Sequence, residues 1–510
     1  MKKQSAGFGV KNVSFWLGMS LVIKNSRSSI RQPERKAAKS RAVAPAQTVA
    51  ENEVAFQTPG GAELRASLVR LASHAATFEA SHLATTLRTS EVLNNFKITT
   101  AGRIIYFGRA VVSNVIHTGA SLLCEAKLDN LGSDTAFFLP PTESPSNLQE
   151  AYNSFFQSWQ NNYRISAEFK VLIADVQSYL TGVRHWLEGL EFGLKTHGDK
   201  QEQEQAILNT VAPRVIESFN GRHERFEEII CALSPESRMA HQDFVRRHWQ
   251  KLFLSSPFGH RTYHKPGGYA GDYEMMNMIH RNQPEGNSLY DKLIHLLLVS
   301  QWPAKSVRNR IAHLHENILN ETARVARTRK SARILNIGCG PAREVQDFLT
   351  KTHLSNQADF TLIDFNEETL LHAGRKLAEA RHKFSRHTPI RTRQISVYEL
   401  LKRTRQNGAG AEKFDLIYCA GLFDYLAPDT CRALIGLWYD SLSPGGLMLI
   451  ANMNDTKPFR NFIEFILDWH LIYRDSREIL SLVPECCRET TRVIAEPTSV
   501  NLFLHIRKPD

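Results

Sequence analysis

Two glycines separate a short apolar run from the start of a candidate helix within residues 333–344. The apolar residues before Gly338 predict a buried strand, and Gly338 and Gly340 allow the backbone to turn sharply where it leaves that strand. Pro341 suits the first turn of a following helix, because the N–H that it lacks would have no partner there. A strand, a glycine turn and a helix N-terminus together predict a cradle for the polar part of a nucleotide-like cofactor.

A carboxylate stands at the end of the next apolar run. Residues 360–364 predict a second strand that ends in Asp364, 24 residues beyond Gly340. An acid at the carboxyl end of that strand can accept hydrogen bonds from both ribose hydroxyls of a nucleoside. The dinucleotide fingerprint would place a third glycine at position 343, where this chain has Arg343. The pattern therefore favours a nucleoside cofactor other than NAD.

Two further strands are predicted downstream, over residues 414–419 and 446–450, the second after a Pro-Gly-Gly turn. Strands that alternate with helices predict a mostly parallel sheet with helices on both faces, in which the carboxyl ends of the strands share one edge. The glycine loop and Asp364 are therefore expected to face a common pocket. We expect this Rossmann-like domain over residues 331–510.

The loop, the acid and the Pro-Gly-Gly turn resemble class I S-adenosylmethionine-dependent methyltransferases over roughly residues 300–510. The resemblance implies S-adenosyl-L-methionine as the cofactor, with the glycine loop at its methionine part and the strand-two acid at its ribose. The family usually has an acid two residues before the first loop glycine; Asn336 stands there and keeps an acceptor without the charge. The residues expected to bind the cofactor are Asn336, Gly338, Cys339, Gly340, Asp364, Phe365, Ser396, Val397, Cys419, Ala420 and Gly421.

A second group of polar side chains stands in the stretch 257–276, which contains four glycines. Its tyrosines and cationic donors, beside a glycine-rich backbone, are typical of a loop laid against a ligand. The alternative is an ordinary turn in which Asp272 caps a helix that begins near Tyr273. In the methyltransferases that this chain resembles, the segment before the first strand commonly forms a lid. The candidates for catalysis are His264, Lys265, Tyr269, Asp272 and Tyr273.

The stretch 257–276 and the run 468–474 also resemble a bacterial group that makes the methyl ester of 3-hydroxypalmitic acid, a quorum-sensing signal. This resemblance implies O-methylation of the carboxylate of a small or fatty-acid-like substrate. A carboxylate is already nucleophilic at neutral pH, whereas an amine or a hydroxyl acceptor would need a base such as His264 or Asp424. The sequence leaves both mechanisms open, and it also leaves open a protein or nucleic-acid acceptor.

The rest of the chain completes a multi-domain α/β fold, in which a small N-terminal β-barrel and a helical region precede the Rossmann-like methyltransferase sheet. Residues 61–140 have strand-like patterns, and residues 145–255 have a helical period typical of a spacer or dimerisation bundle, so a homodimer stays open. Residues 256–330 are expected to form the lid loop and its helices. Residues 1–60 are expected to be a disordered basic tail and linker.

The predicted barrel resembles the PilZ family, which binds cyclic di-GMP. Residues 114–119 match the second motif of that family except that Ile116 replaces a serine, and Arg65 and Arg70 have the wrong spacing for its paired arginines. Because the arginine fork carries most of the phosphate recognition, we expect a degenerate barrel that docks or presents substrate without binding the nucleotide. The alternative function is a cyclic di-GMP effector built on a methyltransferase-like scaffold.

Composition limits the partners and the compartment. The 510-residue chain has a net charge of +11, but the excess is concentrated in residues 1–50, so we do not expect the folded part to bind nucleic acid. Seven scattered cysteines favour neither a disulfide framework nor a zinc site, and no metal is expected. The apolar run 13–23 is too short to span a bilayer and lacks a nearby cleavage site. We expect a cytoplasmic enzyme with at most weak contact to an anionic membrane surface.

Overall fold

The structure is a computed structural model, and part of the chain is described in it. The predicted basic tail and the apolar run 13–23 lie outside the described residues. Within the described part, no helix is both long and apolar enough to cross a lipid bilayer. The described residues are 52–58, 61–72, 75–81, 87–100, 103–117, 121–128, 149, 152–153, 156–157, 164–194, 200–329, 331–404 and 412–510.

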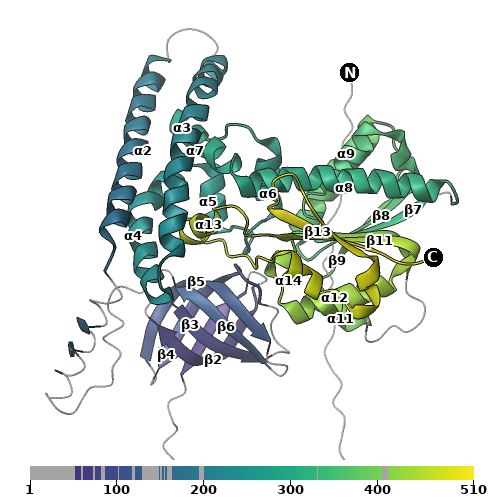
Figure 1. Ribbon diagram of the computed structural model, residues 1–510, viewed down its shortest axis with the longest axis horizontal. Coiled ribbons are helices and arrows are strands. Elements are labelled where there is room, and N and C mark those ends of the chain that lie inside the picture. The colour runs from purple at the N-terminus through teal and green to yellow at the C-terminus, as the bar shows by residue number, and fades with distance from the viewer. Residues whose placement is uncertain are drawn as a thin grey trace, which may run out of the picture. The chain divides into compact units, whose positions relative to one another are not determined.

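Six antiparallel strands close into a barrel in the order β1-β2-β3-β6-β5-β4 (Figure 1). Closure pairs the outer strands with each other, so the barrel has no free edge. Inward-facing side chains fill it, among them Phe56 and Phe78, whose ring centroids lie 5.3 Å apart. The strands are β1 (Glu53–Gln57), β2 (Glu63–Ala72), β3 (Ala75–Ser81), β4 (Val92–Thr100), β5 (Arg103–His117) and β6 (Ser121–Leu128).

The predicted barrel is confirmed, with a difference at its start. β1 lies in the stretch that the sequence assigns to the linker 1–60. The sequence does not predict this strand because it is short and only two of its side chains, those of Val54 and Phe56, point into the barrel. Arg65 of β2 pairs with Glu53 of β1 at 3.3 Å on the outside of the barrel. The end of the PilZ-like motif, residues 118–119, lies outside the described residues.

Long helices follow the barrel, as the helical period over residues 145–255 predicts. Ser166 caps the first of them by accepting the Phe169 N–H, and the buried indole of Trp249 donates to the Ile173 carbonyl at 2.9 Å. The helices before the C-terminal sheet are α2 (Ala167–Gly193), α3 (Lys200–Cys231), α4 (Pro235–Phe253), α5 (Pro257–His264), α6 (Tyr273–Arg281), α7 (Leu289–Val299) and α8 (Trp302–Ala326).

The stretch 257–276 is more helical than the sequence predicts. Helices α5 and α6 take its two ends and leave residues 265–272 as the connection. Ser256 and Asp272 each accept a hydrogen bond from an N–H in the first turn of these helices. The glycine content therefore marks a short connection between two capped helices, and the predicted cap at Asp272 is confirmed.

A seven-stranded sheet carries the C-terminal region in the order β12-β13-β11-β10-β7-β8-β9 (Figure 1). Strands β7 to β11 are parallel, and β13 runs antiparallel to β11. Helices α8, α9 and α10 bury apolar side chains on one face, and α11, α12 and α14 do so on the other. The strands are β7 (Ala332–Ile337), β8 (Ala358–Asp364), β9 (Ile390–Gln394), β10 (Phe414–Ala420), β11 (Leu442–Met453), β12 (Thr491–Ala495) and β13 (Asn501–Arg507). The helices are α9 (Arg343–Lys351), α10 (Glu367–Lys383), α11 (Val397–Thr404), α12 (Pro428–Asp440), α13 (Arg460–Phe465) and α14 (Ser476–Ser481).

The order of the strands reverses between β7 and β10. The chain runs from β7 outward to β9, returns, and then places β10 and β11 on the other side of β7. The loops after β7 and β10 therefore leave the sheet in opposite directions and open a crevice at its carboxyl edge. This arrangement confirms the predicted multi-domain α/β fold. One local prediction is wrong: α9 begins at Arg343, after Ala342 in a left-handed conformation, so Pro341 precedes the helix.

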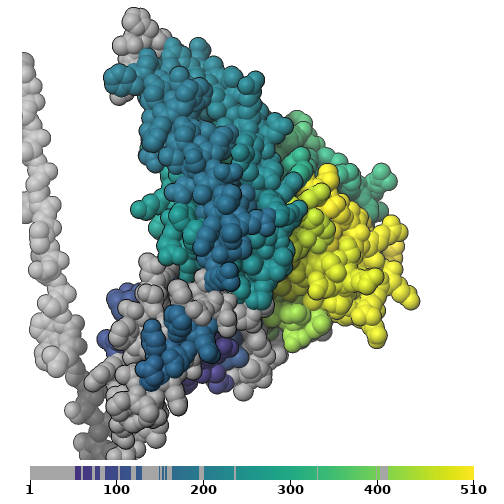
Figure 2. Space-filling model, turned by 60° about the vertical axis from the view of Figure 1, so that its left-hand side comes forward, coloured from purple at the N-terminus to yellow at the C-terminus, as the bar shows by residue number. Residues whose placement is uncertain are grey.

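The helical region and the C-terminal region share a core. The carboxylate of Glu227 in α3 accepts the backbone N–H groups of Asn461 at 3.1 Å and Phe462 at 2.8 Å, both in α13. Figure 2 shows the teal helices in contact with the yellow C-terminal residues. Apolar side chains from residues 459–471 also belong to the core of the helical region. The segment that follows α13 is therefore held in place from the helical side.

Candidate active site

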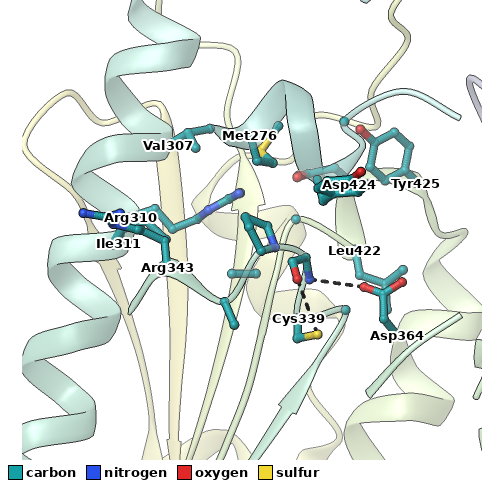
Figure 3. A pocket seen from close by; sticks show the side chains of 18 of the residues that line it. Met276, Val307, Arg310, Ile311, Cys339, Arg343, Asp364, Leu422, Asp424 and Tyr425 are labelled. Atoms are coloured by element: carbon teal, nitrogen blue, oxygen red, sulfur yellow. Dashed lines mark hydrogen bonds between the residues drawn. The ribbon is translucent and has the colours of Figure 1, made fainter. Parts of the chain in front are cut away.

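A cavity opens at the carboxyl ends of the parallel strands, in the crevice between β7 and β10 (Figure 3). Its walls come from the barrel, from the connection before α6, from α8 and from the strand ends. The polar side chains that line it are those of Arg88, Tyr269, Tyr273, His280, Arg310, Asn336, Arg343, Glu344, Asp364, Tyr418, Asp424 and Tyr425. Among the described residues, no group of three or more His, Cys, Asp or Glu side chains is placed to hold a metal ion.

The glycine loop and Asp364 are joined directly. Gly338 and Gly340 have φ angles of 68° and 52°, a left-handed region that glycine enters without a steric cost. The Gly340 N–H donates to Asp364 Oδ2 at 3.2 Å (Figure 3), and the Asn366 N–H donates to Oδ1 at 3.0 Å. Burial raises the pKa of Asp364, and the two N–H groups oppose this shift. The carboxylate therefore fixes the loop while it lines the cavity.

A second buried carboxyl group, that of Glu344, lies beside the loop in the first turn of α9. Its Oε1 accepts hydrogen bonds from Asn336 Nδ2 at 2.9 Å and from the Tyr418 hydroxyl at 2.8 Å. Burial raises the pKa of Glu344, whereas its hydrogen bonds and the charge of Arg310 favour the ionised form. The family resemblance predicts an acid at position 336, where this chain has an amide. The hydrogen bond from Asn336 places the carboxyl group of Glu344 beside that position.

Side chains from outside the sheet pack around Phe365, which follows Asp364. The ring of Tyr269 packs edge-on against Phe365 with centroids 4.9 Å apart, and its hydroxyl lies 3.4 Å from Thr369 Oγ1. The guanidinium carbon of Arg88 lies 4.1 Å from the centroid of the Phe365 ring. The barrel thus supplies a cationic side chain to this wall of the cavity.

The opposite wall carries Asp424 and Tyr425, which follow β10. Asp424 Oδ1 accepts the Met453 N–H at 2.6 Å, and burial raises the pKa of this carboxyl group. The Tyr425 hydroxyl accepts the indole N–H of Trp469 at 2.9 Å and donates to the Ala270 carbonyl at 3.3 Å. Both side chains are therefore held by the backbone or by neighbouring residues.

Most of the residues that the sequence predicts for the cofactor line this cavity. Ser396, Val397 and Cys419 do not. Ser396 Oγ instead donates to Glu399 at 3.0 Å, and Cys419 points into the core below the sheet because side chains alternate along β10. The predicted residues that do line the cavity are Asn336, Gly338, Cys339, Gly340, Asp364, Phe365, Ala420 and Gly421, together with Tyr269 and Tyr273 from the stretch 257–276.

Three of the predicted catalytic residues, His264, Lys265 and Asp272, do not line the cavity. Lys265 is buried, with its amine 3.7 Å from Asp468 Oδ2. Asp272 accepts hydrogen bonds from Arg261 Nε and from an N–H of α6, and the His264 ring packs against other rings of its own helix. Asp272 therefore helps to fix the connection between α5 and α6, and the catalytic roles expected of the three residues stay predictions.

Several polar residues of the cavity escape prediction from the sequence. Glu344 has a local signal, because it stands in the first turn of the helix after the glycine loop. Arg88, His280 and Arg310 have none, because each is a single residue in a distant segment. Burial and three nearby arginines lower the pKa of His280 to about 3, so its imidazole is neutral at pH 7.

Comparison with known protein families finds one domain in this chain. The family model of a methyltransferase domain matches residues 335–448, which include the glycine loop and Asp364. These residues therefore form a methyltransferase domain. A search of curated proteins finds no significant match.

Solved structures with a similar arrangement share little sequence with this chain. A protein of Bordetella parapertussis described as a possible exported protein is 15% identical, with 59% of this chain and 97% of that chain covered and a TM-score of 0.40. The N-methyltransferase NodS of Bradyrhizobium japonicum, in complex with S-adenosyl-L-homocysteine, is 17% identical, with 39% and 87% covered and a TM-score of 0.26. The magnesium protoporphyrin IX methyltransferase ChlM of Synechocystis is 9% identical, with 52% and 99% covered and a TM-score of 0.31. Likeness at this level assigns no substrate to the chain.

S-adenosylmethionine is the cofactor expected of a methyltransferase domain, and the donor and acceptor groups of the cavity fit it. Asp364 offers a carboxylate to ribose hydroxyls, and Phe365 and Tyr269 offer flat faces to an adenine. Glu344 offers a carboxylate to an ammonium group. At Gly340 the space in which a side chain would stand is open, since nothing lies within 4 Å of that position. The glycine loop therefore leaves room for a ligand close to the backbone.

Proposed function

We propose that the chain is an S-adenosylmethionine-dependent methyltransferase that transfers a methyl group to the carboxylate of a small or fatty-acid-like substrate in the cytoplasm. One observation carries the assignment of the cofactor. The hydrogen bond from the Gly340 N–H to Asp364 holds a glycine cradle and a ribose acceptor together at the carboxyl edge of the sheet. Residues 335–448, which include both, match a methyltransferase domain.

The residues of the chain bind and orient the two reactants in this proposal. When it is bound, S-adenosylmethionine supplies a sulfonium methyl group that is open to in-line attack. Asp364 accepts hydrogen bonds from the ribose hydroxyls, and Glu344 accepts hydrogen bonds from the ammonium group of the methionine part. Tyr269 and Phe365 shield the nucleoside from water. Catalysis then consists mostly of alignment and of desolvation of the nucleophile.

The ionisable groups of the cavity support an acceptor that is nucleophilic without a base. Asp424 Oδ1 already accepts the Met453 N–H, so this carboxyl oxygen is engaged. The pKa of His280 is lowered to about 3, so its imidazole is a weak base. A carboxylate substrate is ionised at neutral pH and needs none of these groups to remove a proton.

An apolar wall supports a substrate with a hydrocarbon part. Met276, Val307, Ile311, Met453 and Leu471 line the cavity beside the polar groups. A wall of this kind stabilises an apolar chain by removing it from water, at about 25 cal/mol per Å² buried. A 3-hydroxy fatty acid, the acceptor implied by the sequence resemblance, combines such a chain with a carboxylate.

Calorimetry on two matched variants tests the cofactor site. Asp364→Asn keeps the side-chain shape and removes the charge that receives the ribose hydroxyls. Charge-assisted hydrogen bonds contribute about 1.5–3 kcal/mol each, so S-adenosylhomocysteine is expected to bind this variant at least roughly tenfold more weakly. Asp359→Asn makes the same change at the start of the same strand, where Asp359 pairs with Arg391 at 2.8 Å, and is expected to leave the affinity within about twofold.

Wild-type affinity for S-adenosylhomocysteine in Asp364→Asn would contradict the proposed site. Titration with cyclic di-GMP provides the rival outcome, because binding of that nucleotide alone would support the effector alternative. The acceptor is tested with radiolabelled S-adenosylmethionine and cell lysate, followed by solvent partition. Label in the organic extract supports a lipidic acid, and label retained on protein or nucleic acid contradicts it.

A further inference from the structure

The cavity contains a buried cation that has no hydrogen-bond or ion-pair partner among the described residues. Arg310 of α8 lines the cavity and is 8% exposed, and Figure 3 shows its side chain reaching from the helix toward the centre of the cavity. Its Nε atom is buried without a hydrogen-bond partner. Within the described residues, the guanidinium makes no hydrogen bond and no ion pair within 4.0 Å. A buried charge left in this state costs several kcal/mol, so the site calls for an anionic partner.

The backbone beside Arg310 is shaped to admit the guanidinium. Gly421, the first residue after β10, has a φ of 95°, and a Cβ atom there would lie 3.2 Å from Nη1 and 3.3 Å from Nη2 of Arg310. A side chain at position 421 would therefore press against the guanidinium. Because Gly421 has no side chain, the guanidinium of Arg310 can lie close to the backbone at this position.

The neighbouring acids do not neutralise Arg310 by contact. Glu344 Oε1 is taken by Asn336 and Tyr418, and Asp424 Oδ1 is taken by the Met453 N–H. Both carboxyl groups act on Arg310 only through space. The planar fork of a guanidinium matches a carboxylate, to which it can donate two parallel hydrogen bonds.

We propose that Arg310 binds the carboxylate of a ligand in this cavity. The inference rests on the proposed function, which offers two carboxylates: that of the methionine part of the cofactor and that of the acid acceptor. The chemistry of recognition is the same in both cases. It assigns a ligand-binding role to a residue that lies outside the matched methyltransferase domain.

Calorimetry with ligands that differ by one group tests the proposal and separates the two sources. The full chain, Arg310→Met and Arg310→Lys are titrated with S-adenosylhomocysteine and with 5′-methylthioadenosine, which lacks the amino-acid part. 3-Hydroxypalmitic acid is then titrated into each protein already saturated with S-adenosylhomocysteine. Arg308→Met is the matched control on the same helix. Arg308 donates to the carbonyls of Ile279 at 3.1 Å and Val299 at 2.8 Å, so its loss is expected to lower thermal stability and to leave the affinities within about twofold.

If the cofactor is the source, Arg310→Met binds S-adenosylhomocysteine at least roughly tenfold more weakly and 5′-methylthioadenosine unchanged. If the acceptor is the source, only the affinity for 3-hydroxypalmitic acid falls. Arg310→Lys, which keeps the charge without the fork, is expected to lie between wild type and Arg310→Met. Unchanged affinities in a folded Arg310→Met overturn the role of Arg310, whereas failure of the wild type to bind S-adenosylhomocysteine overturns the proposed function instead.

Discussion

Replacing Ser90 by alanine tests how the barrel is attached to the wall of the cavity. Ser90 is fully buried, and its hydroxyl donates to the His470 carbonyl at 2.8 Å and accepts the His470 N–H at 2.6 Å. His470 stands between Trp469 and Leu471, both of which line the cavity. The Ser90 hydroxyl therefore joins the barrel to a segment that lines the cavity.

The expected loss follows from these two bonds. Without the hydroxyl, the His470 N–H and C=O lose their partners in a place where water cannot replace them. An orphaned buried donor costs about 1–3 kcal/mol, and the second lost bond adds about 1 kcal/mol. The contact is then weakened by about 2–4 kcal/mol. At about 1.4 kcal/mol for each factor of ten, the contact opens at least roughly 30-fold more often.

Hydrogen exchange followed by mass spectrometry measures this opening in the full chain. The His470 amide, which loses its acceptor, is expected to exchange at least roughly 30-fold faster in Ser90→Ala, as read from peptides that cover residues 466–474. Ser113→Ala is the matched control in the same barrel. Ser113 donates to the Glu125 carbonyl at 3.1 Å at an exposed position, so its removal should change stability by less than about 0.5 kcal/mol.

Equal exchange rates in Ser90→Ala and Ser113→Ala would refute the argument. Faster exchange spread evenly over the chain would also refute it, because it would mean a general loss of stability instead of a broken attachment.

Two further predictions concern the wall near the nucleoside and the response to acid. Arg88→Ala removes the cation over the Phe365 ring, an interaction of about 1 kcal/mol. Calorimetry is therefore expected to show roughly fivefold weaker binding of S-adenosylhomocysteine. Arg65→Ala, on the outer side of the barrel, is the control and should bind it with wild-type affinity. Burial lowers the pKa of the fully buried His295 from 6.5 to about 4. Between these two pH values the unfolded chain binds a proton at His295 that the folded chain does not bind, so the stability of the fold decreases as the pH falls. His295→Gln removes this contribution, which is about 1.4 kcal/mol per pH unit. Urea unfolding at pH 7 and pH 5 should therefore show a smaller loss of unfolding free energy in this variant than in wild type. An equal loss in both proteins would contradict the assignment to His295.

The sequence was sufficient where a structural feature depends on neighbouring residues. The glycine loop and Asp364 are each encoded within a few positions, because a strand, its turn and the next helix are local features. The parallel sheet then brings the two together, and the hydrogen bond from Gly340 to Asp364 follows from adjacent strand ends. The barrel was predictable from the alternation of its longer strands, whereas β1 has too few inward residues to stand out.

The sequence was not sufficient where a role depends on where a side chain points. Lys265 and Asp272 have suitable donors and acceptors, but one pairs with Asp468 and the other caps α6. Cys419 has the predicted position along β10 and faces the opposite side of the sheet. Arg310 carries no motif, and its role becomes visible only when α8 packs beside the glycine after β10.

The cavity is lined by residues from outside the C-terminal domain as well as by residues of the glycine loop within it. Arg88, Tyr269 and Arg310 all precede residue 331, so a fragment cut at that point would retain the loop and Asp364 and lose an entire side of the enclosure. A chimera that exchanges only the C-terminal sheet between two such proteins would combine strand ends from one parent with surrounding cavity residues from the other. Barrel, helices and sheet must therefore be transferred together if the cavity is to keep its lining.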